Sequence, residues 1–192
     1  MKHIVVAMIS PSKEIWTIGH STRSLAEFTA LLKQNQIESL ADIRRFPGSR
    51  RYPQFGRDQL AMGLQNEGIA YEHFEKLGGR RAPVPDSPNT AWRNTGFRGY
   101  ADYMVTAAFD EGIRRLIILA AAKRTVIMCA EAVWWQCHRS LIADYLKASG
   151  MAVWHIIGAS KVELHPYTSP AHLIDGRLSY RKEDFQRELP LL

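Results

Sequence analysis

Short apolar stretches alternate along the chain with longer segments in which apolar residues recur every three or four positions. The short stretches predict strands at residues 15–19, 39–43, 69–74, 125–129 and 151–157. Between them, the spacing predicts a helix opening at Ser24, a helix over 58–67, one long or broken helical region over 100–123, and a helix that ends at Gly150. Residues 77–96 are rich in proline and are expected to form a loop.

This alternation predicts the fold class. We expect residues 1–192 to form a single α/β domain, whose mostly parallel sheet is covered by helices on both faces. Ser24 followed by Glu27 is the pattern of a capping box at a helix start. The last part of the chain departs from the alternation, because Asp175-Gly176 is a typical two-residue turn and predicts a C-terminal hairpin.

The composition is that of one globular domain. Hydrophobic residues make up 46% of the 192, which is enough for one well-packed core. No apolar run approaches the roughly 20 residues that a membrane-spanning helix needs, and the apolar stretch at 4–9 is too short for a signal peptide. We therefore expect a cytoplasmic protein without membrane association, in which the two cysteines are thiols or metal ligands. The oligomeric state is left open.

Positive charge is concentrated in one segment. The chain carries a net charge of +6, and residues 44–98 alone account for +5, with nine arginines and one lysine against five acids. Arginine favours forked recognition of phosphate or carboxylate, so an anionic small molecule or a nucleic acid is the expected partner. Aromatic residues interleaved with the arginines either stack on bases or belong to the core, and the sequence leaves both open: Phe46, Tyr52, Phe55, Trp92 and Phe97.

Residues with chemical potential follow the predicted strands. In an open parallel sheet, ligands bind beyond the carboxyl ends of the strands, so the residues that follow each strand should converge. An acid, a base, a thiol and several cations are therefore expected at one edge of the sheet. The converging segments are Gly19-His20-Ser21, Asp42 with Arg44 and Arg45, His73, Cys129 with Glu131, and Cys137-His138-Arg139 at a predicted helix start.

Several of these motifs carry a family resemblance. The chain resembles the domain of unknown function 488 family from about residue 15 to residue 180. The resemblance implies an α/β fold and an active site at these motifs, although the family has no settled activity. One departure is Ala-Val-Trp-Trp-Gln at 132–136, where the family usually has a polar turn with Asp-Pro; the two tryptophans either cover a ligand or pack inward. The motifs that carry the resemblance are Gly19-His20-Ser21, Asp42-Ile-Arg44, Leu77-Gly78-Gly79-Arg80-Arg81, Phe97 to Met104, and Cys129-Ala-Glu131 with Cys137-His138-Arg139.

Each candidate residue has a structural alternative. Cys137 is either a thiolate activated by the helix start or a buried, inert thiol. Glu131 and Asp42 act as general acid or base, or instead neutralise Arg44 and Arg139. His20 carries protons or caps the Ser24 helix. The remaining candidates are expected to bind the substrate: Ser21, Arg44, Arg50, Arg80, His138 and Arg139.

Other kinds of site receive less support. The seven residues between Cys129 and Cys137 match no common zinc spacing, and neither cysteine has the distance from Arg139 that a phosphatase loop requires. Gly78-Gly79 opens no helix, so a nucleotide-binding glycine loop is not supported, and the pair is interpreted as a flexible turn that presents Arg80. We therefore expect neither a metal nor a cofactor.

Two functions agree with these observations. The first is an intracellular enzyme that acts on a phosphate-bearing substrate, a nucleotide or a nucleic acid, by hydrolysis or group transfer. Its catalytic residues would be Glu131, Cys137, His20 and Asp42. The alternative is a non-catalytic module that binds nucleic acid through the arginines and aromatic residues of 44–98.

Overall fold

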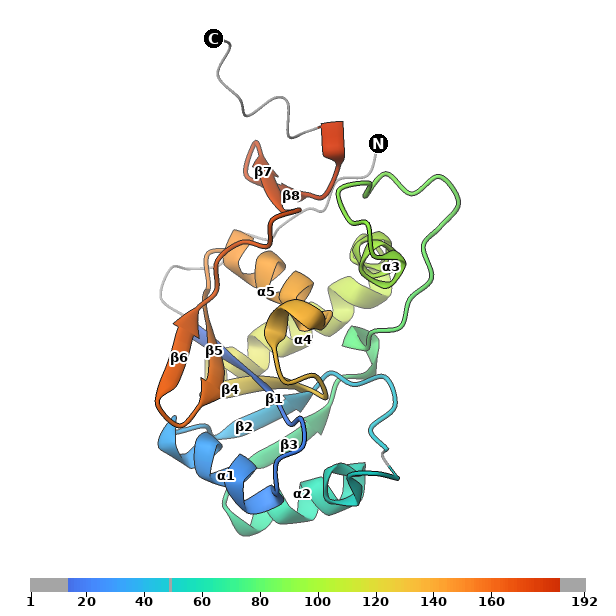
Figure 1. Cartoon of the computed structure of the whole chain (residues 1–192). Coiled ribbons are helices and arrows are strands. Elements are labelled where there is room, and N and C mark those ends of the chain that lie inside the picture. The colour runs from blue at the N-terminus through green and yellow to red at the C-terminus, as the bar shows by residue number, and fades with distance from the viewer. Residues whose placement is uncertain (1–13, 49, 184–192) are drawn as a thin grey trace.

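A six-stranded sheet forms the centre of the molecule (Figure 1). The computed structural model describes residues 14–48 and 50–183. Five strands run parallel, and β6 pairs antiparallel with β5. The order across the sheet is β3-β2-β4-β1-β5-β6. The strands span Glu14–Gly19 (β1), Ser39–Asp42 (β2), Ala70–His73 (β3), Thr125–Cys129 (β4), Ala152–Gly158 (β5) and Lys161–Leu164 (β6).

Helices cover both faces of the sheet, as the alternation predicts. The helices α1 and α2 lie on one face, and α3, α4 and α5 lie on the other (Figure 1). Three short 3-10 helices, η1, η2 and η3, lie in the connections. The helices span Leu25–Gln34 (α1), Pro53–Phe55 (η1), Arg57–Asn66 (α2), Glu75–Leu77 (η2), Thr95–Tyr103 (α3), Ala107–Ala122 (α4), Trp134–Gln136 (η3) and Arg139–Ala148 (α5).

Two hydrophobic cores result, one on each face of the sheet. Phe28 of α1 and Leu60 of α2 pack with Ile18 of β1 on the first face. Tyr100 of α3 and Leu141 of α5 belong to the second core. The residues of β2 and β4 are buried along the whole length of both strands, which is typical of strands covered on two sides.

The capping box at Ser24 is confirmed. The Ser24 side chain accepts a hydrogen bond from the Glu27 amide, and the Glu27 carboxylate accepts one from the Ser24 amide at 2.7 Å. Because Ser24 and Glu27 satisfy free amides at the helix start, α1 begins immediately after Ser24.

The helical region expected over 100–123, long or broken, is broken into α3 and α4. Its predicted start is wrong, because α3 begins at Thr95, within the segment that the sequence assigned to a loop. Asn94 explains the early start, because its side chain accepts hydrogen bonds from the amides of Gly96 and Phe97. Strand β6 was not predicted. Its residues are mostly exposed and it follows a short turn after β5.

The C-terminal hairpin is confirmed. Strands β7 (His172–Ile174) and β8 (Arg177–Ser179) pair antiparallel around Asp175 and Gly176. Both turn residues have positive φ, 50° and 72°, as a two-residue hairpin turn requires. After β8, Tyr180 is fully buried and donates its hydroxyl hydrogen to Asp144 of α5 at 2.9 Å, so the hairpin is tied to the domain.

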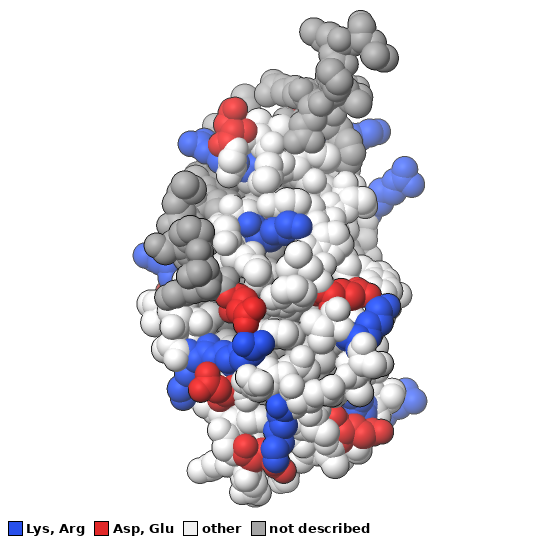
Figure 2. Space-filling model, turned by 90° about the vertical axis from the view of Figure 1, so that its left-hand side faces the viewer, with Lys and Arg blue, Asp and Glu red and all other residues white. Residues whose placement is uncertain are grey.

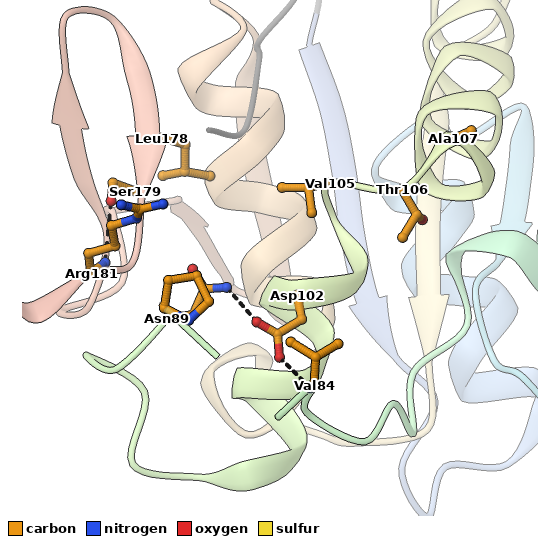
Figure 3. A pocket seen from close by; sticks show the side chains of 10 residues that line it. Val84, Asn89, Asp102, Val105, Thr106, Ala107, Leu178, Ser179 and Arg181 are labelled. Carbon is orange, nitrogen blue, oxygen red and sulfur yellow. Dashed lines mark hydrogen bonds between the residues drawn. The ribbon is translucent and has the colours of Figure 1, made fainter. Parts of the chain in front are cut away.

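Asp102 of α3 anchors the proline-rich loop (Figure 3). Its carboxylate accepts hydrogen bonds from the Val84 amide, the Ser87 hydroxyl and the Asn89 amide group, at 2.6 to 3.0 Å. Asp102 and Asn89 line a pocket of about 470 Å³ that also reaches Arg181 after the hairpin. Asp102 therefore has a structural task, since it fixes the loop against the helix.

The side of the molecule that carries β6 has a mixed surface charge. Figure 2 shows Lys and Arg side chains interspersed with Asp and Glu side chains on this side. Within β6, Lys161 pairs with Glu163 at 2.8 Å. Among the helices of residues 14–48 and 50–183, none is both long and apolar enough to cross a membrane.

Candidate functional site

The sheet topology opens a crevice beyond the carboxyl ends of β1 and β4. The two strands are neighbours, but β1 leads to α1 on one face and β4 leads to α5 on the other. Such a divergence is where open α/β sheets bind ligands. The amides of His20 and Ser21 donate to the carbonyls of Cys129 and Ala130 at 3.0 and 2.9 Å, which ties the two strand ends together.

Gly19 is required at this point. A Cβ at residue 19 would lie 1.7 Å from the Glu131 carbonyl oxygen, so no side chain fits between the strand end and the chain after β4. The next residues turn sharply, and Ser21 has a φ of 53°, in the left-handed region. This close approach places His20 and Ser21 beside Glu131.

A cavity of about 770 Å³ occupies the crevice. Its volume lies within the usual range for small-molecule sites. Both acidic and basic side chains line it, together with two thiols and three aromatic rings. Seven of the predicted site residues are in its lining: His20, Ser21, Arg44, Arg80, Glu131, Cys137 and His138.

Three predicted site residues occupy other places. Asp42 and Arg139 are buried, at 0% and 1% exposure, and Arg50 is exposed. All three are described, and none is among the residues that line the cavity. Their contacts show what Asp42 and Arg139 do instead.

Asp42 holds Arg44 from behind. The Asp42 carboxylate accepts hydrogen bonds from Nε and Nη2 of Arg44 at 2.9 and 2.6 Å, and from the Tyr71 hydroxyl at 2.8 Å. This two-point contact fixes the plane of the guanidinium group. The third nitrogen of the group, Nη1, lies 3.4 Å from Nε2 of His20 in the cavity lining. Asp42 is therefore placed to position Arg44, not to contact a ligand.

Arg139 supports the segment after β4. Its Nη1 and Nη2 donate to the carbonyl oxygens of Glu131 and Ala132 at 2.7 and 2.9 Å. The guanidinium group thus bonds the main chain of Glu131, whereas the Glu131 side chain is exposed and lines the cavity. Arg139 positions the chain that carries Glu131.

His20 is an uncharged base at neutral pH. Its ring stacks on Phe55 with a centroid distance of 4.2 Å, and the residue is only 3% exposed. Burial lowers the pKa of His20 to about 4, and the charge of Arg44 acts in the same direction, although a hydrogen bond to the Ser21 carbonyl opposes it. Since Nδ1 donates to that carbonyl, Nε2 carries the lone pair and faces Arg44.

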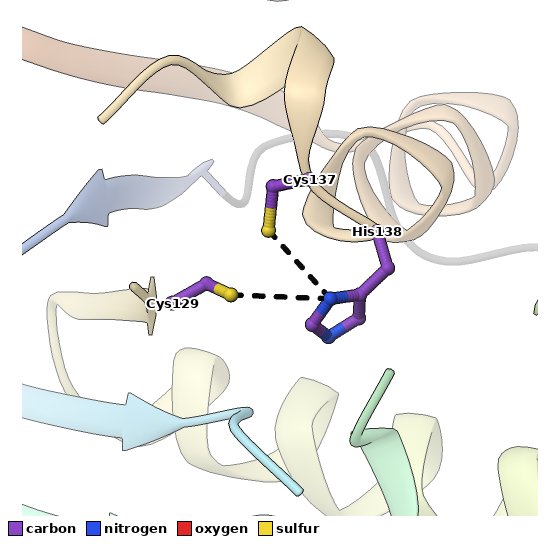
Figure 4. A group of neighbouring side chains, drawn as sticks. All are labelled: Cys129, Cys137 and His138. Atoms are coloured by element: carbon purple, nitrogen blue, oxygen red, sulfur yellow. Dashed lines mark hydrogen bonds between the residues drawn. The ribbon is translucent and has the colours of Figure 1, made fainter. Parts of the chain in front are cut away.

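Cys129, Cys137 and His138 form the deep wall of the cavity (Figure 4). Both Sγ atoms point to Nδ1 of His138, at 3.9 Å from Cys129 and 3.6 Å from Cys137. As the sequence predicts, Cys137 and His138 immediately precede α5. Burial raises the pKa of the Cys137 thiol, but the Cys129 thiol, the Arg139 charge and the Arg139 amide outweigh burial and lower it overall. The pKa of Cys129 is raised, by its hydrogen bond with Cys137 and by burial.

The Gly78-Gly79 pair permits close packing. A Cβ at Gly78 would lie 2.7 Å from the Arg45 Cα, and one at Gly79 would lie 2.8 Å from Nδ1 of His138. The main chain of both glycines therefore packs closely against Arg45 and His138. The interpretation as a flexible turn did not predict this close packing. Arg80 follows with a φ of 59°, and its carbonyl oxygen accepts a hydrogen bond from Arg45 at 2.8 Å. Arg45 and Arg80 therefore meet at the cavity.

The aromatic residues of 44–98 divide between core and cavity. Phe55 and Trp92 are buried, at 0% and 8% exposure, and belong to the core. Phe46, Tyr52 and Phe97 line the cavity, and Phe46 is 64% exposed. The core interpretation is therefore confirmed for Phe55 and Trp92, whereas stacking on bases stays a prediction for the three rings that line the cavity.

The two tryptophans of 132–136 do not line the cavity. Trp134 packs inward, with its ring stacked on His155 at a centroid distance of 4.6 Å. Trp135 is 51% exposed. Neither tryptophan is in the lining, where Ala132 and Gln136 are the residues from this segment.

Some lining residues were not among the predicted site residues. They include Thr22 and Asn94, whereas Arg45 was expected at this edge of the sheet but was given no role in binding. The signal for Arg45 was present in the sequence, because it directly follows Arg44 at the end of a predicted strand. No signal for Asn94 was present in the sequence, because the course of the proline-rich loop brings this residue to the cavity.

Comparison with known proteins identifies one family. Comparison with the curated proteins and with the solved structures finds no match. The family described as "Domain of unknown function DUF488" matches residues 24–146, a span that includes Arg44, Arg80, Glu131 and Cys137 but not His20. Because the match covers more than half of the chain, and because it contains most of the cavity wall, the chain belongs to the DUF488 family.

Proposed function

We propose that this protein is an enzyme that acts on a phosphate-bearing substrate, by hydrolysis or group transfer, in the cavity beyond β1 and β4. The observation that carries the proposal is the shared lining. Arg44, Arg45 and Arg80 come from two different connections and face the same space as Glu131 and Cys137. A module that only binds anions has no need for a carboxylate and two thiols beside its cations.

The arginines are arranged to hold a dianion. Arg44 presents one edge of its guanidinium group to the cavity, because Asp42 occupies the other edge. Arg45 and Arg80 add two further cations at the more exposed part of the lining. Guanidinium groups bind phosphate oxygens through charge-assisted, often paired hydrogen bonds. We assign phosphate binding to these three residues, with Ser21 as an additional donor.

Two residues of the cavity lining are candidates for proton transfer, Glu131 and His20. Glu131 is exposed in the lining, on a segment that Arg139 fixes through main-chain bonds. His20 is neutral at neutral pH and presents an acceptor nitrogen toward Arg44. General acid–base catalysis requires such a positioned group beside the reacting bond. We place that bond between Glu131 and the thiol wall, and we assign Glu131 the role of general acid or base.

The aromatic rings suggest a nucleotide as the substrate. Phe46 and Tyr52 line the cavity next to the arginines, and the guanidinium carbon of Arg45 lies 5.4 Å from the centroid of the Phe46 ring. Exposed rings beside cations are the surface on which a base stacks while its phosphate is held. The same feature favours the second candidate, a non-catalytic nucleic-acid module. Turnover separates the two functions, because a module that only binds leaves its ligand unchanged.

Replacing Arg80 with alanine is expected to weaken nucleotide binding by about tenfold or more. A hydrogen bond to a charged group contributes about 1.5–3 kcal/mol, and about 1.4 kcal/mol corresponds to tenfold in affinity. Isothermal titration of nucleoside monophosphates, nucleoside triphosphates and inorganic phosphate into both chains measures the change.

The matched control is Arg114→Ala. Arg114 is an exposed arginine of α4 that pairs with Asp110 on its own helix, so its removal should leave the affinity unchanged. Equal losses in both variants would show only a general charge effect. If Arg80→Ala binds these nucleotides and inorganic phosphate as tightly as the original chain does, the assignment of phosphate binding to Arg80 is wrong.

A further inference from the structure

Three potential metal ligands converge at the deep wall of the cavity (Figure 4). The Sγ atoms of Cys129 and Cys137 and Nδ1 of His138 all lie within 4.8 Å of one another. A tetrahedral zinc ion, with Zn–S of about 2.3 Å and Zn–N of about 2.0 Å, places sulfur and nitrogen ligands about 3.5 Å apart. The sulfur–nitrogen distances of 3.6 and 3.9 Å in the structure are close to this geometry.

The orientation of His138 directs the lone pair of Nδ1 toward the two thiols. Nε2 of His138 lies 3.2 Å from the carbonyl oxygen of Ile43. A carbonyl oxygen only accepts, so Nε2 carries the hydrogen and Nδ1 carries a lone pair. Histidines that bind metals are held in this way by a second bond at the other ring nitrogen. An ion at the centre of the three atoms would therefore be bound by Nδ1 of His138 and by both Sγ atoms.

The surrounding structure holds the three ligands in place. Cys129 is the last residue of β4, and Cys137 and His138 directly precede α5. The main chain of Gly79 packs against the His138 ring on one side, and the Tyr100 ring lies 4.9 Å from it. Because both supports are buried, the imidazole has little room to turn away from the thiols.

We propose that Cys129, Cys137 and His138 bind a zinc ion whose fourth position faces the cavity. Two thiolates and one imidazole are ligands that zinc prefers, and three protein ligands with an open position are typical of catalytic zinc. The long spacing between the cysteines does not argue against this site, because the strand end and the helix start bring them together. All three ligands are in the cavity lining, so the open position is accessible to water or substrate.

The site would also specify the chemistry of the cavity. When bound, zinc supplies an acidified water molecule at neutral pH. Glu131 lies in the same lining and would accept the proton of that water. This role in hydrolysis rests on the proposed function, whereas the presence of the metal site does not. Cys137 would then be a metal ligand, and its thiolate would not attack the substrate.

Metal titration of the whole chain tests the site. The chain, purified without a histidine tag and stripped with a chelator, is titrated with zinc in competition with a chromophoric chelator. We expect one zinc ion per chain, and an affinity reduced by at least about 100-fold in His138→Ala and in Cys137→Ser. The control His73→Gln alters a histidine at the end of β3 that bonds the Arg44 carbonyl, and it should bind zinc unchanged.

Cobalt provides a readout that needs no variant. Tetrahedral cobalt bound to the original chain should show intense visible bands and a thiolate-to-cobalt charge-transfer band in the near ultraviolet. Failure of a variant to fold therefore does not prevent the test. The proposal is overturned if the original chain binds no metal, if His138→Ala binds zinc as tightly, or if the isolated chain carries a Cys129–Cys137 disulfide and no zinc. Zinc bound by a chain that binds neither nucleotides nor inorganic phosphate would support the metal site and contradict the proposed function.

Discussion

Replacing Asp42 with alanine is expected to lower the free energy of unfolding by about 3–5 kcal/mol, because it leaves the buried charge of Arg44 without its partner. Asp42 is fully buried and Arg44 is 7% exposed. The carboxylate also accepts hydrogen bonds from the Arg44 amide at 3.0 Å and from the Tyr71 hydroxyl. A loss of this size is a large part of the roughly 5–15 kcal/mol that stabilises a typical domain.

Urea unfolding followed by circular dichroism measures the effect. The control is Glu67→Ala, which removes an exposed partner of Lys33 and should cost less than about 1 kcal/mol. If Asp42→Ala lowers the free energy of unfolding no more than the control does, the Arg44 guanidinium group is able to reach solvent when Asp42 is removed. The cavity wall would then differ from the structure described above.

The second large effect concerns acid. Stability is expected to fall steeply as the pH drops below about 6.5, because His155 and His20 remain uncharged in the folded protein. Burial is the largest of the causes that lower the pKa of His155 to about 2, and the positive charge of Arg139 acts in the same direction. Burial likewise lowers the pKa of His20 to about 4. The unfolded chain takes up these protons at a pKa near 6.5, so protonation favours unfolding as the pH falls below that value.

A directed chain of hydrogen bonds explains why His155 resists protonation. Asp144 only accepts, so Nε2 of His165 donates to it at 3.0 Å and leaves Nδ1 of His165 as an acceptor. Nε2 of His155 donates to that atom at 2.8 Å, and Nδ1 of His155 accepts from the Thr17 hydroxyl at 2.7 Å. A second proton on His155 would force the Thr17 hydroxyl to accept this hydrogen bond, and it would place a charge on a side chain that is only 1% exposed.

Unfolding by urea at a series of pH values from 7 to 4.5 tests this expectation. Each of the two histidines should contribute about 1.4 kcal/mol for every pH unit below 6.5. His155→Gln should remove about half of this slope, even if it lowers stability at pH 7. A slope that is flat in the original chain, or unchanged in His155→Gln, would contradict the assignment.

The local elements of the fold were the most predictable from sequence. The capping box at Ser24 and the turn at Asp175-Gly176 depend on residues close together in the chain, and both are confirmed. Strand β6 and the early start of α3 were missed for physical reasons. The exposed residues of β6 form no apolar stretch, and the glycines at 96 and 99 weaken the helical pattern that Asn94 nevertheless caps.

The candidate site was predictable in outline but not in detail. The rule that strand ends converge brought His20, Arg44 and Glu131 to one edge of the sheet, and all three line the cavity. Sequence alone does not give the direction of a side chain at a helix start. Arg139 therefore looked like an anion ligand, although it points inward to two carbonyl groups. Cys129, Cys137 and His138 come together because the end of β4 packs beside the start of α5. The spacing of these residues in the sequence does not reveal this packing.

Turnover by the original chain and by Glu131→Gln is the most direct test of the enzyme assignment. Glu131 is exposed, so the variant should fold normally, whereas loss of a general acid or base reduces rates by about 10² to 10⁴-fold. The measurement is product release from nucleotides, phosphate esters and short oligonucleotides, with stability compared by urea unfolding. We predict turnover of at least one of these substrates by the original chain and its loss in Glu131→Gln. Binding of these ligands without any turnover, or equal turnover by both chains, would contradict the account.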